Sequence, residues 1–359
     1  MLDDRHASVR LHAPARLHLG FLDPSGSLGR RYGSLGLVVD GFETEIELSA
    51  SISEQVTASG VAERAEVDRA AAYLQLLQRR SGRGEPLQLR LVQVLPAHAG
   101  FGSGTQLALA IGRAFAHWHG LNLSTPALAQ WLGRGLRSGI GIAGFDHGGL
   151  LVDGGPGANG APASVLSRIP LPPTWRVLVV QDSAHQGLAG AAERRAMATL
   201  SPLSQALAAD ICHQVLMRVL PGAAAADFVP FAAGLNRIQL VLGEHFASAQ
   251  GGAAFTSAAV GRLIEWISTA TLGPDAKAEG PEHGIAHRAM HDAEYVAATG
   301  QSSWGPTGFA ILPSQGLAEA VVDAARAANL IAPSLTVRIV SGRNAGATVV
   351  DERPARRAH

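Results

Sequence analysis

A run of small residues between positions 100 and 105 has the composition of an anion-binding turn. It reads Gly100-Phe101-Gly102-Ser103-Gly104-Thr105, with a strand-like stretch before it and a helix-like stretch after it. Glycines let the backbone approach a ligand closely, and N–H groups at the start of a helix favour an anion. No Gly-Lys-Ser/Thr follows, so the run is not a Walker loop. We expect phosphate at Gly100, Gly102, Ser103, Gly104 and Thr105; the alternative is a tight turn without a ligand.

Two other segments carry residues that could act on an anion or an aromatic ring. The first is APARLHLGFLD, residues 13–23, in which Arg16 could clamp a phosphate or carboxylate and His18 could donate to either. We list both as catalytic candidates; a structural ion pair and a core histidine are the alternatives. The second is GQSSWGPTGFAIL, residues 300–312. There Trp304 could stack on an aromatic substrate or pack in the core, and the expected phosphate contacts are Ser302, Ser303 and Gly305.

Taken in order, the three segments resemble the motifs of the galactokinase–homoserine kinase–mevalonate kinase–phosphomevalonate kinase (GHMP) superfamily. The matching stretches are Pro14–Gly20, Pro96–Gly104 and Gly300–Gly308. The resemblance implies an α+β, GHMP-kinase-like fold of two domains. We expect an N-terminal mixed α/β domain over residues 1–165, holding the glycine-rich phosphate loop. A C-terminal ferredoxin-like α+β domain is expected over residues 174–359.

One position departs from the kinases of that superfamily. Where mevalonate-kinase-like members have Ser-Gly-Ile-Asp, this chain reads Ser138-Gly139-Ile140-Gly141. Glycine has no carboxylate to accept a proton from an attacking hydroxyl group. Asp146 could replace the missing aspartate if the chain folds back, and we list it with Ser103 as a candidate metal ligand.

Three longer runs are similar to one branch, the β-ribofuranosylaminobenzene 5′-phosphate synthases. They are RLHLGFLDPSGSLGRRYGSLGL, RGLRSGIGIAGFDHGGLLVDGG and GLNRIQLVLGEHFASAQGG. The resemblance implies a transferase that joins phosphoribosyl pyrophosphate to 4-aminobenzoate or 4-hydroxybenzoate, with release of CO2 and pyrophosphate, in tetrahydromethanopterin biosynthesis. It also implies Mg²⁺, a homodimer and no need for pyridoxal phosphate. An ATP-dependent small-molecule kinase and a non-catalytic ligand-binding protein are the alternatives.

Other polar residues are candidates on weaker grounds. Asp182 follows an apolar strand and Glu193 comes soon after it, so either could contact ribose or Mg²⁺ in catalysis, or cap a helix. Arg30 and Arg31 could meet a polyanionic substrate or form an exposed basic pair. Asn236 is a substrate-binding candidate because its stretch matches the family.

A row of three histidines gives a weaker indication of a metal. His283, His287 and His291 recur every four residues, so a helix would align them as zinc ligands. Eight residues of helix span about 12 Å, too far for one tetrahedral ion. A surface or packing role is favoured.

These residues need a frame of strands and helices to position them. Alternation predicts a half-buried strand at Phe42–Leu48, and apolar patterns predict further strands and helices. A Pro/Gly/Ala-rich connection covers 156–173, and 272–284 reads as a loop. The other expected strands are 87–95, 175–181, 308–312, 335–340 and 346–350, and the expected helices are 105–117, 202–219, 235–249, 257–271 and 317–328.

Composition narrows the function classes. The 359 residues are 47% hydrophobic and 16% charged, which suits roughly two folded domains. Equal numbers of basic and acidic residues, 29 each, argue against nucleic-acid binding. No apolar run is long enough to cross a membrane and no signal peptide is evident, so we expect a cytoplasmic protein. Lys277 is the only lysine, which disfavours mechanisms that need one.

Overall fold

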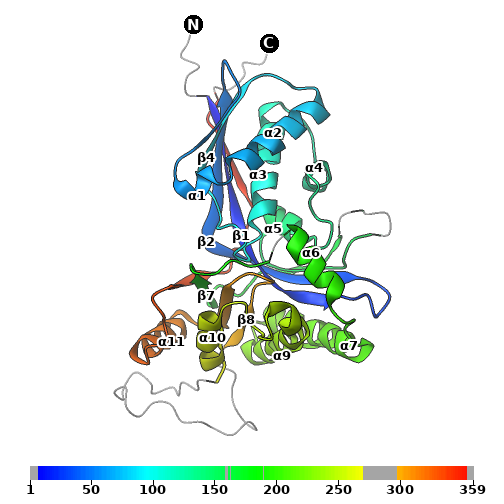
Figure 1. Ribbon diagram of the computed structural model, residues 1–359, viewed down its shortest axis with the longest axis vertical. Helices are drawn as coiled ribbons and strands as arrows, with labels where there is room; N and C mark the ends of the chain where they lie inside the picture. The colour runs from blue at the N-terminus through cyan, green and yellow to red at the C-terminus, as the bar shows by residue number, and fades with distance from the viewer. Residues whose placement is uncertain (1–6, 158–160, 162, 189, 270–296, 354–359) are drawn as a thin grey trace.

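The computed structural model describes residues 7–157, 161, 163–188, 190–269 and 297–353. Two β-sheets lie toward opposite ends of its long axis, each covered by helices (Figure 1). None of the helices in these ranges is long and apolar enough to span a bilayer. The expected loop at 272–284, Lys277 and the three spaced histidines lie outside the described residues.

The first sheet has seven strands. Strands β1 (Ser8–Asp23) and β2 (Tyr32–Ala50) form its long antiparallel centre. The sheet order is β11-β1-β2-β4-β3, with β5 on β2 and β6 on β5. In β2 the odd-numbered glutamates from 43 to 47 are partly exposed while Phe42, Thr44, Ile46 and Leu48 are buried, which confirms the predicted alternation. The shorter strands are β3 (Gln55–Ala58), β4 (Leu87–Gln93), β5 (Leu150–Asp153), β6 (Val165–Ile169) and β11 (Thr348–Asp351).

Helix α3 (Ser103–Trp118) packs on β1 and β2 and positions the glycine-rich turn. Its side chains Leu107, Ile111, Ala114 and Phe115 are buried at the helical spacing expected. Because these apolar side chains fix the helix on the sheet, they also fix where the turn at its N-terminus lies. The neighbouring helices are α1 (Val61–Arg64), α2 (Val67–Ser81), α4 (Thr125–Trp131) and α5 (Ile140–His147).

The second sheet is antiparallel, with the order β10-β7-β9-β8. Strand β7 (Arg176–Asp182) is apolar at successive positions because both of its faces are covered. Leu178 and Val180 pack against α10 (Ala258–Thr269) and α11 (Gln315–Ala327). Val177 and Val179 point to the other face, into a larger hydrophobic core that the two sheets share. The remaining strands are β8 (Ala298–Gln301), β9 (Thr307–Leu312) and β10 (Leu335–Ser341).

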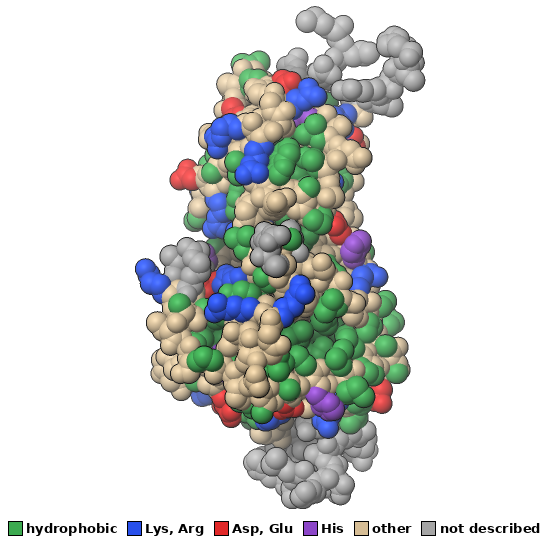
Figure 2. Space-filling model, turned by 90° about the vertical axis from the view of Figure 1, so that its right-hand side faces the viewer, with side chains coloured by type: hydrophobic (Ala, Val, Ile, Leu, Met, Phe, Trp, Pro, Cys, Tyr) green, Lys and Arg blue, Asp and Glu red, His purple; other side chains and the backbone are tan. Residues whose placement is uncertain are grey.

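The larger core joins the two sheets. It contains Leu17, Leu19 and Leu37 from the first sheet, Val177 from the second, and Leu235 from α9. Around it lie α6 (Gly190–Thr199), α7 (Gln205–Gln214), a π-helical turn (Val215–Val219), α8 (Leu220–Ala225) and α9 (Phe228–Ala247). On the face shown in Figure 2, basic side chains lie at mid-height and in the upper half, and hydrophobic side chains cover part of the lower half.

The end of the described chain returns to the first sheet. The strand expected at 346–350 is present as β11, and it pairs antiparallel with β1, Val9 opposite Asp351. The range 174–359 expected for the C-terminal domain therefore includes a segment that pairs with the opposite sheet. The first and last strands of the described chain, β1 and β11, therefore lie side by side.

Candidate active site

The glycine-rich turn opens onto a cavity of about 650 Å³. Gly100 and Gly102 have φ angles of 91° and 72°, the left-handed region that favours glycine. Gly102 precedes the first residue of α3 and no side chain caps the helix. The N-terminus of a 16-residue helix therefore faces a cavity, an arrangement that favours an anion. All five residues of this turn that were expected at phosphate line the cavity.

Four arginine side chains surround this turn. Arg16, Arg69, Arg134 and Arg137 all line the cavity. A Cβ atom at position 102 would lie 2.9 Å from Arg16 Cζ. At position 104 a Cβ atom would lie 3.2 Å from Arg69 Nη1 and 3.3 Å from Arg134 Nη2. The two glycines thus leave the space in which three guanidinium groups approach the backbone.

The four arginines differ in how their charge is compensated. Arg137 forms a two-point ion pair with Glu193, at 2.8 and 2.9 Å. Arg69 pairs with Glu66, and Arg134 donates to the Thr105 hydroxyl group. Within the described residues, Arg16 has no ion-pair partner, and its Nε is inaccessible to solvent and forms no hydrogen bond. A partly buried cation without an ion-pair partner is costly, so Arg16 is suited to an incoming anion.

Desolvation also changes the acid–base behaviour of Arg16. Burial lowers the pKa of Arg16 from 12.5 to about 10, while the nearby carboxylate of Glu193 acts in the opposite direction. The guanidinium group still carries its charge at neutral pH. It can therefore serve as an electrostatic contact and not as a proton donor.

His18 lies beside this cluster and is uncharged. Its side chain is buried, and Nε2 has no hydrogen-bond partner among the described residues. Burial, followed by the charges of Arg16 and Arg137, holds the pKa of His18 well below the ordinary 6.5. A neutral imidazole can donate or accept one hydrogen bond at Nε2, depending on its tautomer.

The third motif is joined to the other two by one hydroxyl group. Ser302 Oγ donates to the carbonyl oxygen of Gly100 at 2.7 Å and accepts from the backbone N–H of His18 at 2.9 Å. A Cβ atom at position 305 would lie only 2.4 Å from the Gly100 nitrogen, so glycine is required for this approach. The three motifs therefore meet in space. Ser302 was expected at phosphate, but it does not line the cavity and its hydroxyl group holds the loops together.

The other residues of this motif do line the cavity. Ser303, Trp304 and Gly305 form part of its wall. Trp304 is also buried against Phe246, with ring centroids 4.6 Å apart. Its position agrees with core packing, and the same side chain lies at the cavity wall, where the predicted stacking on an aromatic substrate would take place.

Gly141 lies close to Arg16 and has no side chain that could form an ion pair with it. A Cβ atom on Gly141, in the first turn of α5, would lie 3.2 Å from Thr105 Cγ2 and 3.7 Å from Arg16 Nε. This is the position that matches the aspartate of the mevalonate-kinase-like motif. A carboxylate there would face Arg16 and the phosphate turn. With glycine, position 141 supplies neither an ion-pair partner for Arg16 nor the base of a kinase.

A second cavity, of about 480 Å³, adjoins the first. Both cavities include His18, Phe21, Ser303 and Trp304 in their walls. Asn236, a predicted substrate contact, lines this second cavity. Its amide group is occupied by the Ala297 carbonyl and the Thr299 N–H.

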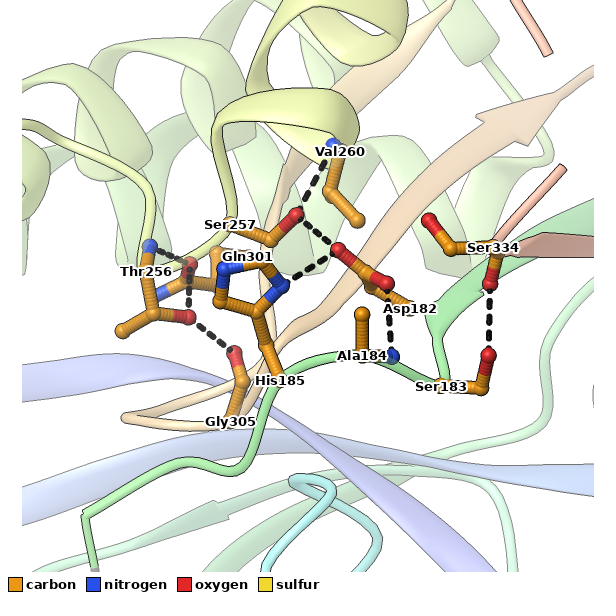
Figure 3. Close-up of polar contacts among 10 residues, drawn as sticks. All are labelled: Asp182, Ser183, Ala184, His185, Thr256, Ser257, Val260, Gln301, Gly305 and Ser334. Atoms are coloured by element: carbon orange, nitrogen blue, oxygen red, sulfur yellow. Dashed lines mark hydrogen bonds and ion pairs between the residues drawn. The ribbon is translucent and has the colours of Figure 1, made fainter. Parts of the chain in front are cut away.

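The structure places Asp182 elsewhere. Its buried carboxylate accepts hydrogen bonds from the Ser257 hydroxyl (2.6 Å) and the Ala184 N–H (2.9 Å), and lies 2.7 Å from His185 Nδ1 (Figure 3). Burial would raise the pKa of Asp182, but hydrogen bonds led by that of Ser257 lower it. Asp182 lines neither of the two cavities; it joins the end of β7 to the start of α10.

Three other predicted site residues also lie apart from the cavity. Asp146 accepts a hydrogen bond from Thr125 at the end of α5 and does not line it. Arg30 donates to the Gly155 carbonyl and Arg31 to the Pro24 carbonyl. Both arginines are exposed, in agreement with the alternative of an exposed basic pair. Glu193, in contrast, does line the cavity.

Within the described residues, the donor groups do not form a protein-held metal site. Mg²⁺ is usually held by one or two carboxylates together with substrate phosphates. In the described part of the chain no group of three or more His, Cys, Asp or Glu residues could hold an ion. Glu193 lines the phosphate cavity but is paired with Arg137. Of the two expected ligands, only Ser103 lies at the cavity.

Sequence reasoning missed three of the four arginines. Arg134 and Arg137 alternate with glycines in a run that carried the family resemblance, and this proximity to the motif was the available signal. Arg69 comes from α2 and has no local signal. Since 28 of the 29 basic residues are arginine, residue type alone did not distinguish these side chains.

Known proteins resemble this chain in both sequence and structure. The family model described as GHMP kinases N terminal domain matches residues 67–149. A β-ribofuranosylphenol 5′-phosphate synthase of Archaeoglobus fulgidus is 37% identical over 244 residues, which are 64% of this chain and 75% of that protein. A protein of the same name from Methanothermobacter thermautotrophicus is 29% identical over 245 residues, 64% of this chain and 74% of that protein.

Solved structures support the fold. Homoserine kinase from Cytophaga hutchinsonii matches with a TM-score of 0.62 at 15% identity, covering 96% of this chain and 97% of that chain. Mevalonate diphosphate decarboxylase from Staphylococcus aureus matches with a TM-score of 0.63 at 13% identity, covering 96% and 98%. At these identities the likeness shows the fold alone, and it confirms the expected GHMP-type α+β architecture.

Proposed function

This chain belongs to the β-ribofuranosylphenol 5′-phosphate synthase family, within the GHMP fold, and we propose that it transfers ribofuranosyl 5-phosphate from phosphoribosyl pyrophosphate to a 4-substituted benzoate. The products would be a β-ribofuranosyl arene 5′-phosphate, CO2 and pyrophosphate. 4-Hydroxybenzoate would give the phenol in the relatives' name, and 4-aminobenzoate would give the aminobenzene. The observation that carries the proposal is a cavity at a helix N-terminus lined by four arginines, of which Arg16 has no ion-pair partner within the described residues and faces no carboxylate at position 141.

The arginine positions suit a donor with two phosphate groups at different places. Phosphoribosyl pyrophosphate carries a diphosphate on the anomeric carbon and a monophosphate on the 5-carbon. Arg16 approaches Gly102, whereas Arg69 and Arg134 approach Gly104 on the other part of the turn. We assign the diphosphate to Arg16, the helix N-terminus and Ser103. The 5-phosphate then falls to Arg69 and Arg134.

The reaction needs a stabilised leaving group rather than a strong base. The ring carbon that bears the carboxylate bonds to the anomeric carbon as the bond from that carbon to the diphosphate oxygen breaks. The carboxylate then leaves as CO2, and its bonding electron pair restores the aromatic ring. Arg16 and the backbone N–H groups would stabilise the negative charge that develops on the diphosphate. No proton acceptor at position 141 is required.

A kinase mechanism fits the geometry less well. It needs a group that accepts a proton from the attacking hydroxyl, and Gly141 supplies none. Asp146, the proposed replacement, is held by Thr125 away from the cavity. A Mg²⁺ ion, which the family resemblance implies, would bind mainly through the substrate's phosphates, because Glu193 is already paired.

The direct test offers the purified protein phosphoribosyl pyrophosphate and Mg²⁺ with 4-aminobenzoate or 4-hydroxybenzoate labelled at the carboxylate carbon. We expect labelled CO2 and pyrophosphate to form in equal amounts with at least one acceptor. A parallel reaction replaces phosphoribosyl pyrophosphate with ATP and a panel of small alcohols. Phosphorylated alcohol in that reaction, with no CO2 in the first, would overturn the proposal in favour of a kinase.

The resemblance also leads us to propose a wider setting. We propose that the reaction belongs to tetrahydromethanopterin biosynthesis, part of one-carbon metabolism, and takes place in the cytoplasm, with the protein acting as a homodimer. Sedimentation of the purified protein measures the dimer directly. Deletion of the gene from its host should leave tetrahydromethanopterin undetectable, and an unchanged level would contradict this setting.

A further inference from the structure

The second cavity differs in chemistry from the arginine-lined one. It lies among α9, α10, β8 and the third motif, and its wall is largely apolar. The polar amides there are committed to the fold: Gln239 bonds the Leu19 carbonyl and the Gln301 N–H. The apolar side chains that line it include Phe21, Leu240, Leu242, Phe246, Phe255 and Ile264.

Such a wall favours an aromatic molecule over a polyanion. Burying an aromatic ring against apolar side chains is favourable, and ring pairs add further attraction. Moving a phosphate from water into the same surroundings, without cations, is costly. Among the described residues, the lining of the second cavity contains two carboxylates, Glu244 and Glu265, and no arginine or lysine, whereas four arginines line the first.

The two cavities meet at His18. Its side chain is 3% exposed and contributes to both walls, and Nε2 has no partner among the described residues. A buried ring nitrogen without a hydrogen bond is costly unless a ligand supplies one. This nitrogen therefore marks the junction as a place where a polar group of a ligand would be held.

We propose that the second cavity is the acceptor site for the aromatic acid, and that His18 contacts its carboxylate at the junction. The inference rests on the proposed function and specifies where the second substrate binds. The ring carbon bearing the carboxylate then lies at the shared wall, facing the donor's anomeric carbon. The para substituent points toward the apolar part of the cavity.

A neutral His18 suits this reaction. A full ion pair would stabilise the carboxylate in the ground state and oppose its loss as CO2. A single hydrogen bond from a neutral imidazole orients the carboxylate without that penalty. His18 is thus a specificity and positioning contact, while Arg16 acts on the departing diphosphate.

The test narrows the second cavity at its rim. Leu240 lines the cavity and is 53% exposed, so Leu240→Trp adds bulk without disturbing the core. Leu216→Trp is the matched control, because Leu216 is 62% exposed and lines neither cavity. Calorimetry measures the binding of 4-hydroxybenzoate, 4-aminobenzoate and inorganic pyrophosphate, and steady-state kinetics gives the KM of each substrate.

We expect Leu240→Trp to weaken aromatic binding and raise the acceptor KM at least tenfold. Pyrophosphate binding and the KM of phosphoribosyl pyrophosphate should stay within twofold, and Leu216→Trp should match the wild type. In the wild type, aromatic acid and pyrophosphate should bind together. An unchanged acceptor affinity in Leu240→Trp, or mutual exclusion of the two ligands, would overturn the inference.

Product formation by the wild type separates this inference from the proposed function. If the wild type forms product and Leu240→Trp keeps the normal acceptor KM, the acceptor site is wrong and the function stands. If no product forms but Leu240→Trp selectively abolishes aromatic binding, the site stands and the reaction is wrong.

Discussion

Two loops of similar composition line the same cavity but differ in what contacts them. The loop at 100–105 and the loop at 300–305 are both rich in glycine and serine, and both were predicted to bind phosphate. In the first, the turn opens onto a cavity and four arginines surround it. In the second, the Ser302 hydroxyl group is fully engaged by Gly100 and His18, and Trp304 is buried.

The difference shows what makes a glycine-rich loop a binding site. Small residues let other groups come close to the loop backbone, and those groups can belong either to a ligand or to another loop. At 100–105 the approaching groups are the guanidinium groups of Arg16, Arg69 and Arg134, and Arg16 has no ion-pair partner within the described residues. At 300–305 the approaching group is the first loop itself. The unsatisfied polar and charged groups, rather than the glycines, distinguish a ligand site from a structural contact.

Among the variants that test this comparison, removal of the Arg16 side chain should have the largest effect on activity. We expect Arg16→Met to lower kcat/KM by about 100-fold or more, as loss of one group that stabilises a developing anion does. Thermal unfolding should stay at the wild-type temperature or rise, since an unpaired, partly buried cation is removed. Arg31→Met, at an exposed arginine outside both cavities, is the control. Activity within threefold of wild type in Arg16→Met would show that the cluster does not bind the donor.

A carboxylate introduced at position 141 should compensate the positive charge of Arg16. In Gly141→Asp the new side chain would face Arg16 Nε, which lies 3.7 Å from the Cβ position. We expect pyrophosphate affinity to fall at least tenfold, measured by calorimetry. Gly141→Asn has the same shape without the charge and should lose less. Equal losses in the two variants would mean that steric contact with Thr105, rather than charge, is responsible.

A Cβ atom at position 102, in the loop at 100–105, should displace the Arg16 side chain. Gly102→Ala places that atom 2.9 Å from Arg16 Cζ at a φ of 72°, and we expect about a tenfold loss of kcat/KM. Gly120→Ala is matched for conformation, with a φ of 65° and nothing within 4 Å. It should show the cost of left-handed backbone, about 1–2 kcal/mol of unfolding free energy, without a kinetic effect. A kinetic loss as large in Gly120→Ala would remove the case for contact with Arg16.

A substitution in the loop at 300–305 should change the unfolding free energy of the protein rather than its affinity for pyrophosphate. Ser302→Ala leaves the backbone N–H of His18 and the backbone carbonyl of Gly100 without their hydrogen-bond partner. This loss costs about 1–3 kcal/mol of unfolding free energy. Pyrophosphate affinity of the folded protein should change less than threefold. Ser103→Ala should show the reverse pattern, with weaker pyrophosphate binding and little change in denaturant unfolding. The opposite result in this pair would exchange the roles of the two loops.

The smallest expected effect is a pH dependence of stability from His18. Above about pH 6.5 the ring is neutral in both folded and unfolded chains. Below that pH the unfolded chain binds a proton that the folded chain does not, because the pKa of buried His18 lies well below 6.5. The unfolding free energy therefore falls as pH decreases, by up to about 1.4 kcal/mol per pH unit for this group.

The comparison with His18→Gln isolates that contribution. His119 and His245, whose pKa values are also lowered by burial, titrate in both proteins. Denaturant unfolding between pH 5 and pH 8 should thus give a flatter curve for the variant. Parallel curves would show that folding does not lower the pKa of His18.

Much of the fold and part of the site followed from the sequence. Alternation at Phe42–Leu48 and helical spacing in Leu107–Phe115 are local patterns, and local patterns determine strands and helices. The same holds for the turn at 100–105, whose glycines permit its conformation. The absent carboxylate at Gly141 is likewise a property of residue type and can be read without coordinates.

Tertiary structure alone decided which polar groups are free. Asp182 and Ser302 were reasonable candidates by type, but partners distant in sequence, Ser257 and Gly100, occupy their oxygens. Arg69 reaches the phosphate turn from a separate helix, and His18 lies where two cavities meet. Hydrogen bonding and charge compensation depend on distances between segments, and sequence spacing carries no information about those distances until the chain has packed.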